Sequence, residues 1–195
     1  MRDGNNIREV ENLGIDWMGF IFYPKSSRYV SSLPDYLPEN AQRVGVFVNE
    51  SMAVIKEKTD SFQLHMVQLH GDETPQMCSE LQRSGVKVIK AFNIGDSFPV
   101  EKVKNYEGVC DFFLFDTQTV QHGGSGRKFN WKVLTEYRGE TPFLLSGGIS
   151  MEDADDILRF AHPQFAGIDI NSRFETAPAQ KNSLLIQQFL EKTGK

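Results

Sequence analysis

Three apolar runs in this sequence each end on a polar or glycine residue that is capable of chemistry. The runs are Phe112–Phe115 before Asp116, Phe143–Leu145 before Ser146-Gly147-Gly148, and Gly167–Ile170 before Asn171-Ser172. Strands of a parallel sheet are covered on both faces, so they read as continuous apolar runs rather than alternating ones. Ligands of α/β folds gather where the carboxyl ends of such strands emerge. The pattern therefore predicts a parallel sheet with a reactive rim, as in a small-molecule enzyme.

Length and charge limit the classes of protein to which the chain can belong. Its 195 residues, 39% of them hydrophobic, are enough to bury one substantial core, and we expect a single domain over residues 1–195. The net charge of −5 and the absence of a Lys/Arg run argue against a nucleic-acid partner. No apolar stretch approaches the roughly 20 residues that span a bilayer, and the polar N-terminus does not resemble a secretory signal. We expect no membrane partner and a cytoplasmic location.

The two cysteines, Cys78 and Cys110, lack the spacing of metal ligands. A disulfide scaffold is not typical of an α/β chain of this size. Both are expected to be reduced and structural.

Apolar runs alternate with amphipathic stretches along the whole chain. Seven strands are expected, at Trp17–Phe22, Arg43–Val48, Met66–Leu69, Val86–Ala91, Phe112–Phe115, Phe143–Leu145 and Gly167–Ile170. Helices are expected at Asn5–Leu13, Met52–Thr59, Pro75–Ser84, Val100–Tyr106, Trp131–Tyr137, Met151–Phe160 and Asn182–Lys192. This order predicts a parallel sheet, either closed into a barrel or doubly wound.

Two glycine-rich segments follow strands of the predicted sheet. Gly123-Gly124-Ser125-Gly126 has two interpretations, a flexible turn or an anion cradle, because glycine lets backbone N–H groups approach a phosphate. It matches neither the Walker nor the dinucleotide-binding pattern. Ser146-Gly147-Gly148 stands directly at a strand exit and precedes a predicted helix whose N-terminal amides favour an anion. Two such loops on one rim favour phosphate.

Three charged or titratable side chains are candidates for the chemistry. Asp116 ends the most apolar strand, where a carboxyl is suited to donating a proton, but a turn aspartate is an equal alternative. His70 also lies at a strand end, and a hydrogen-bonded rim histidine is the simpler interpretation. Arg28 is either a solvated loop residue or, through its planar fork, a ligand for a substrate carboxylate.

These segments resemble the phosphoribosylanthranilate isomerase family, the (β/α)8-barrel enzymes of tryptophan biosynthesis. The matching stretches run in family order across nearly the whole chain: Met18-Gly19-Phe20-Ile21-Phe22-Tyr23-Pro24-Lys25-Ser26-Ser27-Arg28-Tyr29, Val44-Gly45-Val46-Phe47-Val48-Asn49, Val67-Gln68-Leu69-His70-Gly71-Asp72-Glu73, Phe115-Asp116-Thr117, Gly123-Gly124-Ser125-Gly126, Leu145-Ser146-Gly147-Gly148-Ile149, and Gly167-Ile168-Asp169-Ile170-Asn171-Ser172. The resemblance implies a TIM barrel.

The resemblance also implies an activity and a set of roles. The reaction is an Amadori rearrangement of N-(5-phosphoribosyl)anthranilate, with no metal or organic cofactor. Asp116 would be the general acid that opens the ribose ring, and Arg28 would face the anthranilate carboxylate. The remaining substrate-binding residues implied are His70, Gly124, Ser125, Gly147, Gly148, Asp169, Asn171 and Ser172, with Gly147, Gly148, Asn171 and Ser172 around the phosphate.

The sequence departs from the family pattern in two places. After Ile170 the family more often shows Ser-Ser-Gly-Val-Glu, whereas this chain has Asn171-Ser172-Arg173-Phe174-Glu175. The family also begins with a strand ending in Lys-x-Cys-Gly, whose cysteine is the general base, and Met1 corresponds to a position after that strand. We therefore expect only seven of the eight barrel strands here, and a working protein that carries an additional N-terminal strand with its cysteine.

Two other functions remain open from the sequence. One is a non-catalytic phosphosugar-binding barrel that keeps the acid and the phosphate cradle but lacks the base. The other is a different phosphate-binding barrel isomerase of histidine or tryptophan synthesis, against which Arg28 and the single acid Asp116 argue. The sequence carries no signal that fixes an oligomeric state.

Overall fold

The computed structural model describes residues 1–117 and 130–194, and its principal sheet has seven parallel strands in sequence order. Each strand pairs with the next one along the chain. The strands are β1 (Trp17–Ile21), β2 (Gln42–Phe47), β3 (Met66–Leu69), β4 (Lys87–Ile94), β5 (Phe112–Thr117), β6 (Phe143–Leu145) and β7 (Phe165–Ile168). Because consecutive strands are parallel neighbours, their carboxyl ends meet at one rim.

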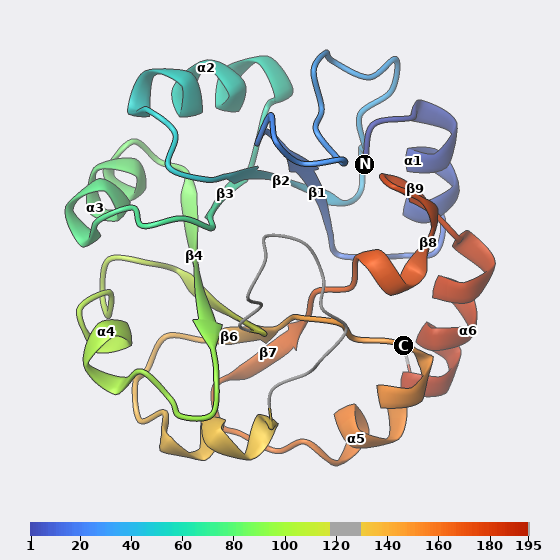
Figure 1. The fold of residues 1–195 in the computed structure, drawn as a ribbon. Coiled ribbons are helices and arrows are strands. Elements are labelled where there is room, and N and C mark those ends of the chain that lie inside the picture. Colours follow the sequence, from blue (N-terminus) through green and yellow to red (C-terminus); the bar gives the residue numbers. More distant parts are fainter. Residues whose placement is uncertain (118–129, 195) are drawn as a thin grey trace.

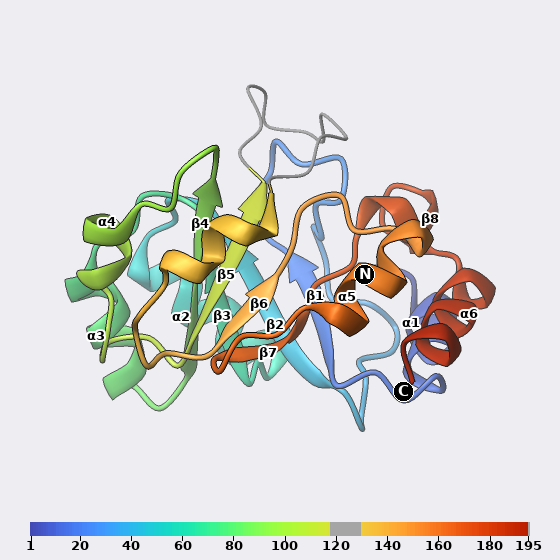
Figure 2. The same cartoon turned by 90° about the horizontal axis from the view of Figure 1, so that it is seen from below.

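The helices surround the curled sheet on its outer side (Figures 1 and 2). They are α1 (Gly4–Glu11), α2 (Met52–Phe62), α3 (Pro75–Arg83), α4 (Val100–Lys104), α5 (Ala154–Arg159) and α6 (Ser183–Thr193), with 3₁₀ turns η1 (Trp131–Glu136), η2 (Met151–Asp153) and η3 (Ser172–Phe174). The prediction of a barrel-type α/β fold with seven strands is confirmed. Strands β1 and β7 are the two ends of the sheet, and no pairing joins them in the described ranges.

Apolar side chains form two separate clusters, one on each face of the sheet. The larger cluster lies between the sheet and the helices and includes Phe20, Phe47 and Phe113, all fully buried. The smaller one fills the barrel interior with Val44, Met66, Ile89, Ala91, Leu114 and Leu144. Alternate strand residues point to opposite faces, so coverage on both sides explains why these strands read as continuous apolar runs.

Side-chain caps fix the starts of several helices. Thr74 accepts a hydrogen bond from the Met77 amide at 3.3 Å, and Pro75 occupies the first turn of α3, where its missing N–H costs nothing. At the start of η2 the Ser150 amide donates to the Asp153 carboxylate at 2.7 Å. The Asp153 carboxylate therefore satisfies a backbone donor at the start of this turn.

Several predicted boundaries are wrong, among them both ends of β7. The sequence predicts a strand over Gly167–Ile170, but pairing with β6 begins at Phe165 and ends at Ile168. The register is irregular between Phe143 and Leu144, where β7 contributes one more residue than β6. The helix expected at Trp131–Tyr137 is a 3₁₀ turn, and the one expected at Met151–Phe160 is divided into η2 and α5.

The sequence analysis also missed a short hairpin that follows η3. It pairs β8 (Glu175–Ala177) with β9 (Gln180–Lys181) in antiparallel fashion. Asn6 on α1 holds it in place, because the Lys181 amide donates to the Asn6 Oδ1 at 2.7 Å and the Asn6 Nδ2 donates to the Lys181 carbonyl at 2.9 Å. The hairpin is therefore tied to the first helix of the chain.

None of the described helices has the length and apolar character needed to cross a membrane.

Candidate active site at the carboxyl ends of the strands

At the rim, polar side chains follow the last inward-facing apolar residues of four strands. Met66, Leu114 and Leu144 belong to the interior cluster. Because side chains of a strand alternate, the residues two and four positions later face the same way. This places Gln68 and His70 above Met66, Asp116 above Leu114, Ser146 above Leu144, and Asp169 above Gly167, which pairs with Leu144. The rim thus gathers an imidazole, a hydroxyl and two carboxyls over an apolar interior.

His70 joins Asp116 across the mouth of the barrel. The His70 Nε2 lies 3.2 Å from the Asp116 Oδ2, and the His70 Nδ1 lies 3.3 Å from the Gln68 Oε1. Both side chains of this pair remain about one quarter exposed, with 27% for His70 and 24% for Asp116. The carboxyl is thus oriented by the protein and still open to a ligand.

The second oxygen of Asp116 is fixed by the turn that ends β5. The Thr117 amide donates to the Asp116 Oδ1 at 2.7 Å, and the Thr117 hydroxyl donates to the Gly147 carbonyl at 3.2 Å. Gly147 has φ +92°, in the left-handed region, and a Cβ there would come 2.6 Å from the Asp116 Oδ1. Asp116 therefore has the backbone contact of a turn aspartate, and its role as a general acid stays a prediction.

Asp169 lies beside this group, just beyond the end of β7. The Ser146 hydroxyl donates to the Asp169 Oδ2 at 3.2 Å. Burial raises the pKa of Asp169, and the negative charge of Asp116 adds to the effect. Burial and the neighbouring carboxylate therefore both disfavour the charged form of Asp169.

The predicted phosphate residues come from the ends of β6 and β7. In the loop after β6, Gly147 and Gly148 have φ angles of +92° and +72°, in the left-handed region that favours glycine. Asn171 stands at the N-cap position of the short turn η3 without a side-chain cap hydrogen bond, and Ser172 is the first residue of the turn. Gly124 and Ser125 lie outside the described residues.

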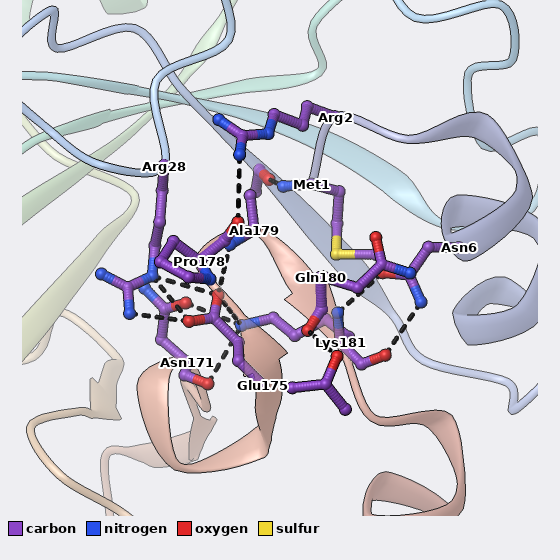
Figure 3. A network of polar contacts seen from close by, with 12 residues as sticks. Met1, Arg2, Asn6, Arg28, Asn171, Glu175, Pro178, Ala179, Gln180 and Lys181 are labelled. Atoms are coloured by element: carbon purple, nitrogen blue, oxygen red, sulfur yellow. Dashed lines mark hydrogen bonds and ion pairs between the residues drawn. The ribbon is translucent and has the colours of Figure 1, made fainter.

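Arg28 lies in the connection after β1 and is paired with a residue that the sequence analysis did not assign. Its Nε lies 3.0 and 2.8 Å from the two carboxylate oxygens of Glu175, and its Nη2 lies 2.6 Å from the Oε2 (Figure 3). Glu175 begins strand β8 and its side chain is only 4% exposed. The Arg28 side chain is thus fixed by its ion pair with Glu175 and is not a freely solvated loop arginine.

Lys181 completes this group from strand β9. Its Nζ lies 3.1 Å from the Glu175 Oε1 and donates to the Asn171 side-chain oxygen at 2.6 Å and carbonyl at 3.1 Å (Figure 3). Burial lowers the pKa of Lys181, while Glu175 opposes the shift. Burial likewise opposes ionisation of Glu175, but hydrogen bonding by Arg28 and the charge of Lys181 leave its pKa lowered overall.

A buried ion pair supports the loops beneath His70. Lys90 on β4 donates to the Leu69 and Gly71 carbonyls at 3.0 and 2.8 Å and contacts the Glu73 Oε2 at 3.2 Å. Glu73 in turn accepts hydrogen bonds from the amides of Asn49 and Gly71. Lys90 and Glu73 therefore tie the loops after β2 and β3 together.

Neither cysteine lies at the mouth of the barrel. Both are free and buried; Cys78 is on α3 and Cys110 precedes β5, at the amino end of that strand. Both are therefore outside a disulfide, as expected of reduced cysteines, and their structural role stays a prediction. Within residues 1–117 and 130–194, no cluster of His, Cys, Asp or Glu side chains has an arrangement that could hold a metal ion.

Glu175, Lys181 and Gln68 were missed as site residues. Gln68 could have been found, since it stands two positions before His70 in the same strand and therefore shares its face. Glu175 and Lys181 lie in a hairpin of five strand residues, too short to produce a periodic pattern.

Comparison with known proteins agrees with this geometry. A model of the N-(5'-phosphoribosyl)anthranilate isomerase family matches residues 1–192. A protein of that name from Phocaeicola vulgatus is 53% identical over 190 residues, covering 97% of this chain and 93% of the relative. One from Parabacteroides distasonis is 47% identical, covering 98% of this chain and 89% of the relative.

Solved structures are similar over the full length of the chain. The phosphoribosylanthranilate isomerase of Thermotoga maritima superposes with a TM-score of 0.84 at 30% identity, covering 100% of this chain and 98% of that one. Another structure holds phosphoribosylanthranilate isomerase in complex with reduced 1-(o-carboxyphenylamino)-1-deoxyribulose 5-phosphate. It superposes with a TM-score of 0.79 at 28% identity, with the same coverage.

Proposed function

Because the chain belongs to the N-(5'-phosphoribosyl)anthranilate isomerase family, we propose that it converts N-(5'-phosphoribosyl)anthranilate to 1-(2-carboxyphenylamino)-1-deoxyribulose 5-phosphate in tryptophan biosynthesis. The observation that carries the proposal is Asp116, an oriented and partly exposed carboxyl at the mouth of the barrel. Its contact with His70 and the Thr117 amide fixes both of its oxygens. We place this activity in the cytoplasm.

Asp116 is the general acid of the reaction. It donates a proton to the ribose ring oxygen, and the bond from that oxygen to C1 breaks as the anilino nitrogen lone pair forms an iminium ion. Loss of the C2 proton to a general base then gives an enolamine, which tautomerises to the ketose. A positioned acid or base typically contributes about 10² to 10⁴-fold to such a step.

The other rim residues bind the two anionic ends of the substrate. Arg28 pairs with the anthranilate carboxylate, since a guanidinium matches its planar geometry. The phosphate is held by the loops after β6 and β7, from Gly147, Gly148, Asn171 and Ser172, where barrels of this type often bind phosphate. Asp169 and His70 border the sugar between them, and Gly124 and Ser125 belong to the loop that flanks the substrate.

The described residues place no cysteine where it could act as the general base, because Cys78 and Cys110 both lie away from the mouth of the barrel. The family resemblance assigns this role to the cysteine of a Lys-x-Cys-Gly strand. Turnover by this chain should therefore be assayed directly.

The test follows the fluorescence of anthranilate compounds during turnover. We expect conversion of the substrate, and a fall of about 10² to 10⁴-fold in kcat for Asp116→Asn with a modest change in KM. Asp60→Asn, an exposed change on α2, is the control and should leave kcat unaltered. Binding of substrate without turnover would instead identify a phosphosugar-binding protein.

A further inference from the structure

Glu175 occupies one defined edge of the Arg28 guanidinium. The Arg28 Nε lies 3.0 and 2.8 Å from the two carboxylate oxygens of Glu175, and the Nη2 lies 2.6 Å from the Oε2 (Figure 3). A guanidinium has five N–H donors in a rigid plane, and this side-on pairing uses those on the edge that joins Nε to Nη2. The outer edge, between Nη1 and Nη2, stays available.

The outer edge of Arg28 is the part that a ligand can reach. Within the described ranges Nη1 makes no hydrogen bond, and Figure 3 shows a terminal nitrogen of Arg28 turned away from Glu175. The Arg28 side chain is 25% exposed, whereas that of Glu175 is 4% exposed. The buried carboxylate therefore determines which way the exposed edge points.

Glu175 is itself held from two other directions. The Lys181 Nζ lies 3.1 Å from its Oε1, and the Ala179 amide donates to the same oxygen at 3.1 Å. Asn6 pins the backbone of Lys181 to α1 through two hydrogen bonds. A carboxylate with this many fixed donors has little freedom to turn, so it can act as a rigid support for the arginine.

The charges in this group do not cancel. Arg28 and Lys181 are two cations that share one carboxylate, which leaves a net charge of +1. Without Lys181, the pair formed by Arg28 and Glu175 would be neutral and would attract a substrate carboxylate only weakly. Lys181 also donates to Asn171, in the loop after β7, and thereby connects the Arg28 subsite to the proposed phosphate loop.

We propose that Glu175 is a positioning residue that aims the outer edge of Arg28 at the substrate carboxylate, and that Lys181 supplies the positive charge that keeps this subsite attractive to an anion. The proposal rests on the proposed function, because it takes the anthranilate carboxylate as the partner of Arg28. Glu175 and Lys181 act through Arg28 and do not touch the reacting atoms.

A purely structural ion pair would behave differently in binding experiments. If Glu175 only anchored the hairpin, its loss would weaken every ligand of the barrel to the same extent. If it positions Arg28, its loss weakens only ligands that carry the carboxylate. Two ligands that differ in this one group therefore separate the two roles.

The experiment measures dissociation constants by titration calorimetry for two compounds. One is reduced 1-(o-carboxyphenylamino)-1-deoxyribulose 5-phosphate, and the other is the same compound without the ring carboxyl group. The variants are Glu175→Gln, Lys181→Met and Arg28→Ala, with Asp156→Asn as a control. Asp156 forms an exposed ion pair with Arg159 on α5 and should change neither constant.

Glu175→Gln is expected to weaken the carboxylated ligand by roughly tenfold and the other ligand by less than about twofold. Lys181→Met also removes the contact with Asn171 in the proposed phosphate loop, so it should weaken both ligands somewhat and the carboxylated one more. It remains informative if Glu175→Gln does not fold, because its Glu175 is still paired with Arg28. In an Arg28→Ala background, Glu175→Gln should add no further selective loss.

Equal weakening of both ligands by Glu175→Gln and by Lys181→Met, or no weakening of either, would overturn the proposal. Failure of the proposed function has a different signature, which appears in the unmodified protein. The unmodified chain would then bind neither compound, or would bind both equally with no loss in Arg28→Ala.

Discussion

Gly147 lies directly against the carboxyl of Asp116, since a Cβ at Gly147 would come 2.6 Å from the Asp116 Oδ1. Real Cβ atoms do not approach an oxygen so closely, so any side chain at this position must displace Asp116 or the loop after β6. The Thr117 amide and hydroxyl lie in the same contact, which couples the ends of β5 and β6.

Gly147→Ala should therefore reduce kcat by about 10² or more, because small displacements of a catalytic group have large effects on rate. Gly85→Ala is the matched control. Gly85 has nearly the same φ, +91° against +92°, but a Cβ there would meet nothing within 4 Å. The control should lose about 1 kcal/mol of unfolding free energy and keep its kcat. Equal kcat values in the two variants would contradict the steric argument.

Lys90→Met should destabilise the protein strongly. Lys90 and Glu73 are each about 1% exposed, and removing the lysine leaves a buried carboxylate without its cation. The expected loss is about 3–5 kcal/mol in the free energy of unfolding, measured by urea denaturation.

The double variant Lys90→Met with Glu73→Gln tests the cause of that loss. It should recover part of the stability, because the neutral amide still offers an oxygen to the Asn49 or Gly71 amide. A loss below about 1 kcal/mol in Lys90→Met alone would show that the pair contributes little.

The sequence was most informative where one physical constraint controls a long segment. Burial on both faces makes strands such as Phe112–Phe115 and Phe143–Leu145 continuous apolar runs, so these were located within two residues of their ends. The same strand ends led to Asp116 and Gly147, because the rim of a parallel sheet follows from its topology. Boundaries failed at β7, where a register irregularity has no compositional signal.

The partners of the rim residues could not be predicted in the same way. Arg28 and Glu175 are 147 positions apart, and only the folded chain brings them together. Either residue alone reads as a charged loop side chain. His70 and Asp116 were each found at a strand end, but their contact depends on the curl of the sheet across β4, which single-strand patterns do not contain.

His70→Ala tests that contact. We expect kcat to fall about 10-fold to 100-fold, because Asp116 loses the imidazole that orients its Oδ2, while KM changes less. In an Asp116→Asn background the same change should have little further effect, since residues that act as a unit are not additive. His65→Asn serves as the control, because His65 accepts a hydrogen bond from the Arg43 amide at the opposite end of β3. Additive losses in the double variant would assign His70 an independent role.

Glu175 should make the stability of the protein sensitive to acid. Burial opposes its ionisation, but Arg28 and Lys181 lower the pKa of Glu175 below the ordinary value of 4.5. A carboxyl with a lowered folded-state pKa stabilises the fold above its unfolded pKa, and this stabilisation is lost as pH falls through the folded value. The difference in unfolding free energy between the unmodified chain and Glu175→Gln should thus be constant near neutral pH and shrink below about pH 4.5.

Urea denaturation between about pH 7 and pH 3 measures this difference. Glu57→Gln is the control, because the Glu57 carboxyl is 66% exposed and its pair with Lys58 contributes little. A difference that stays constant down to about pH 3 would mean that the Glu175 carboxylate is not held as described.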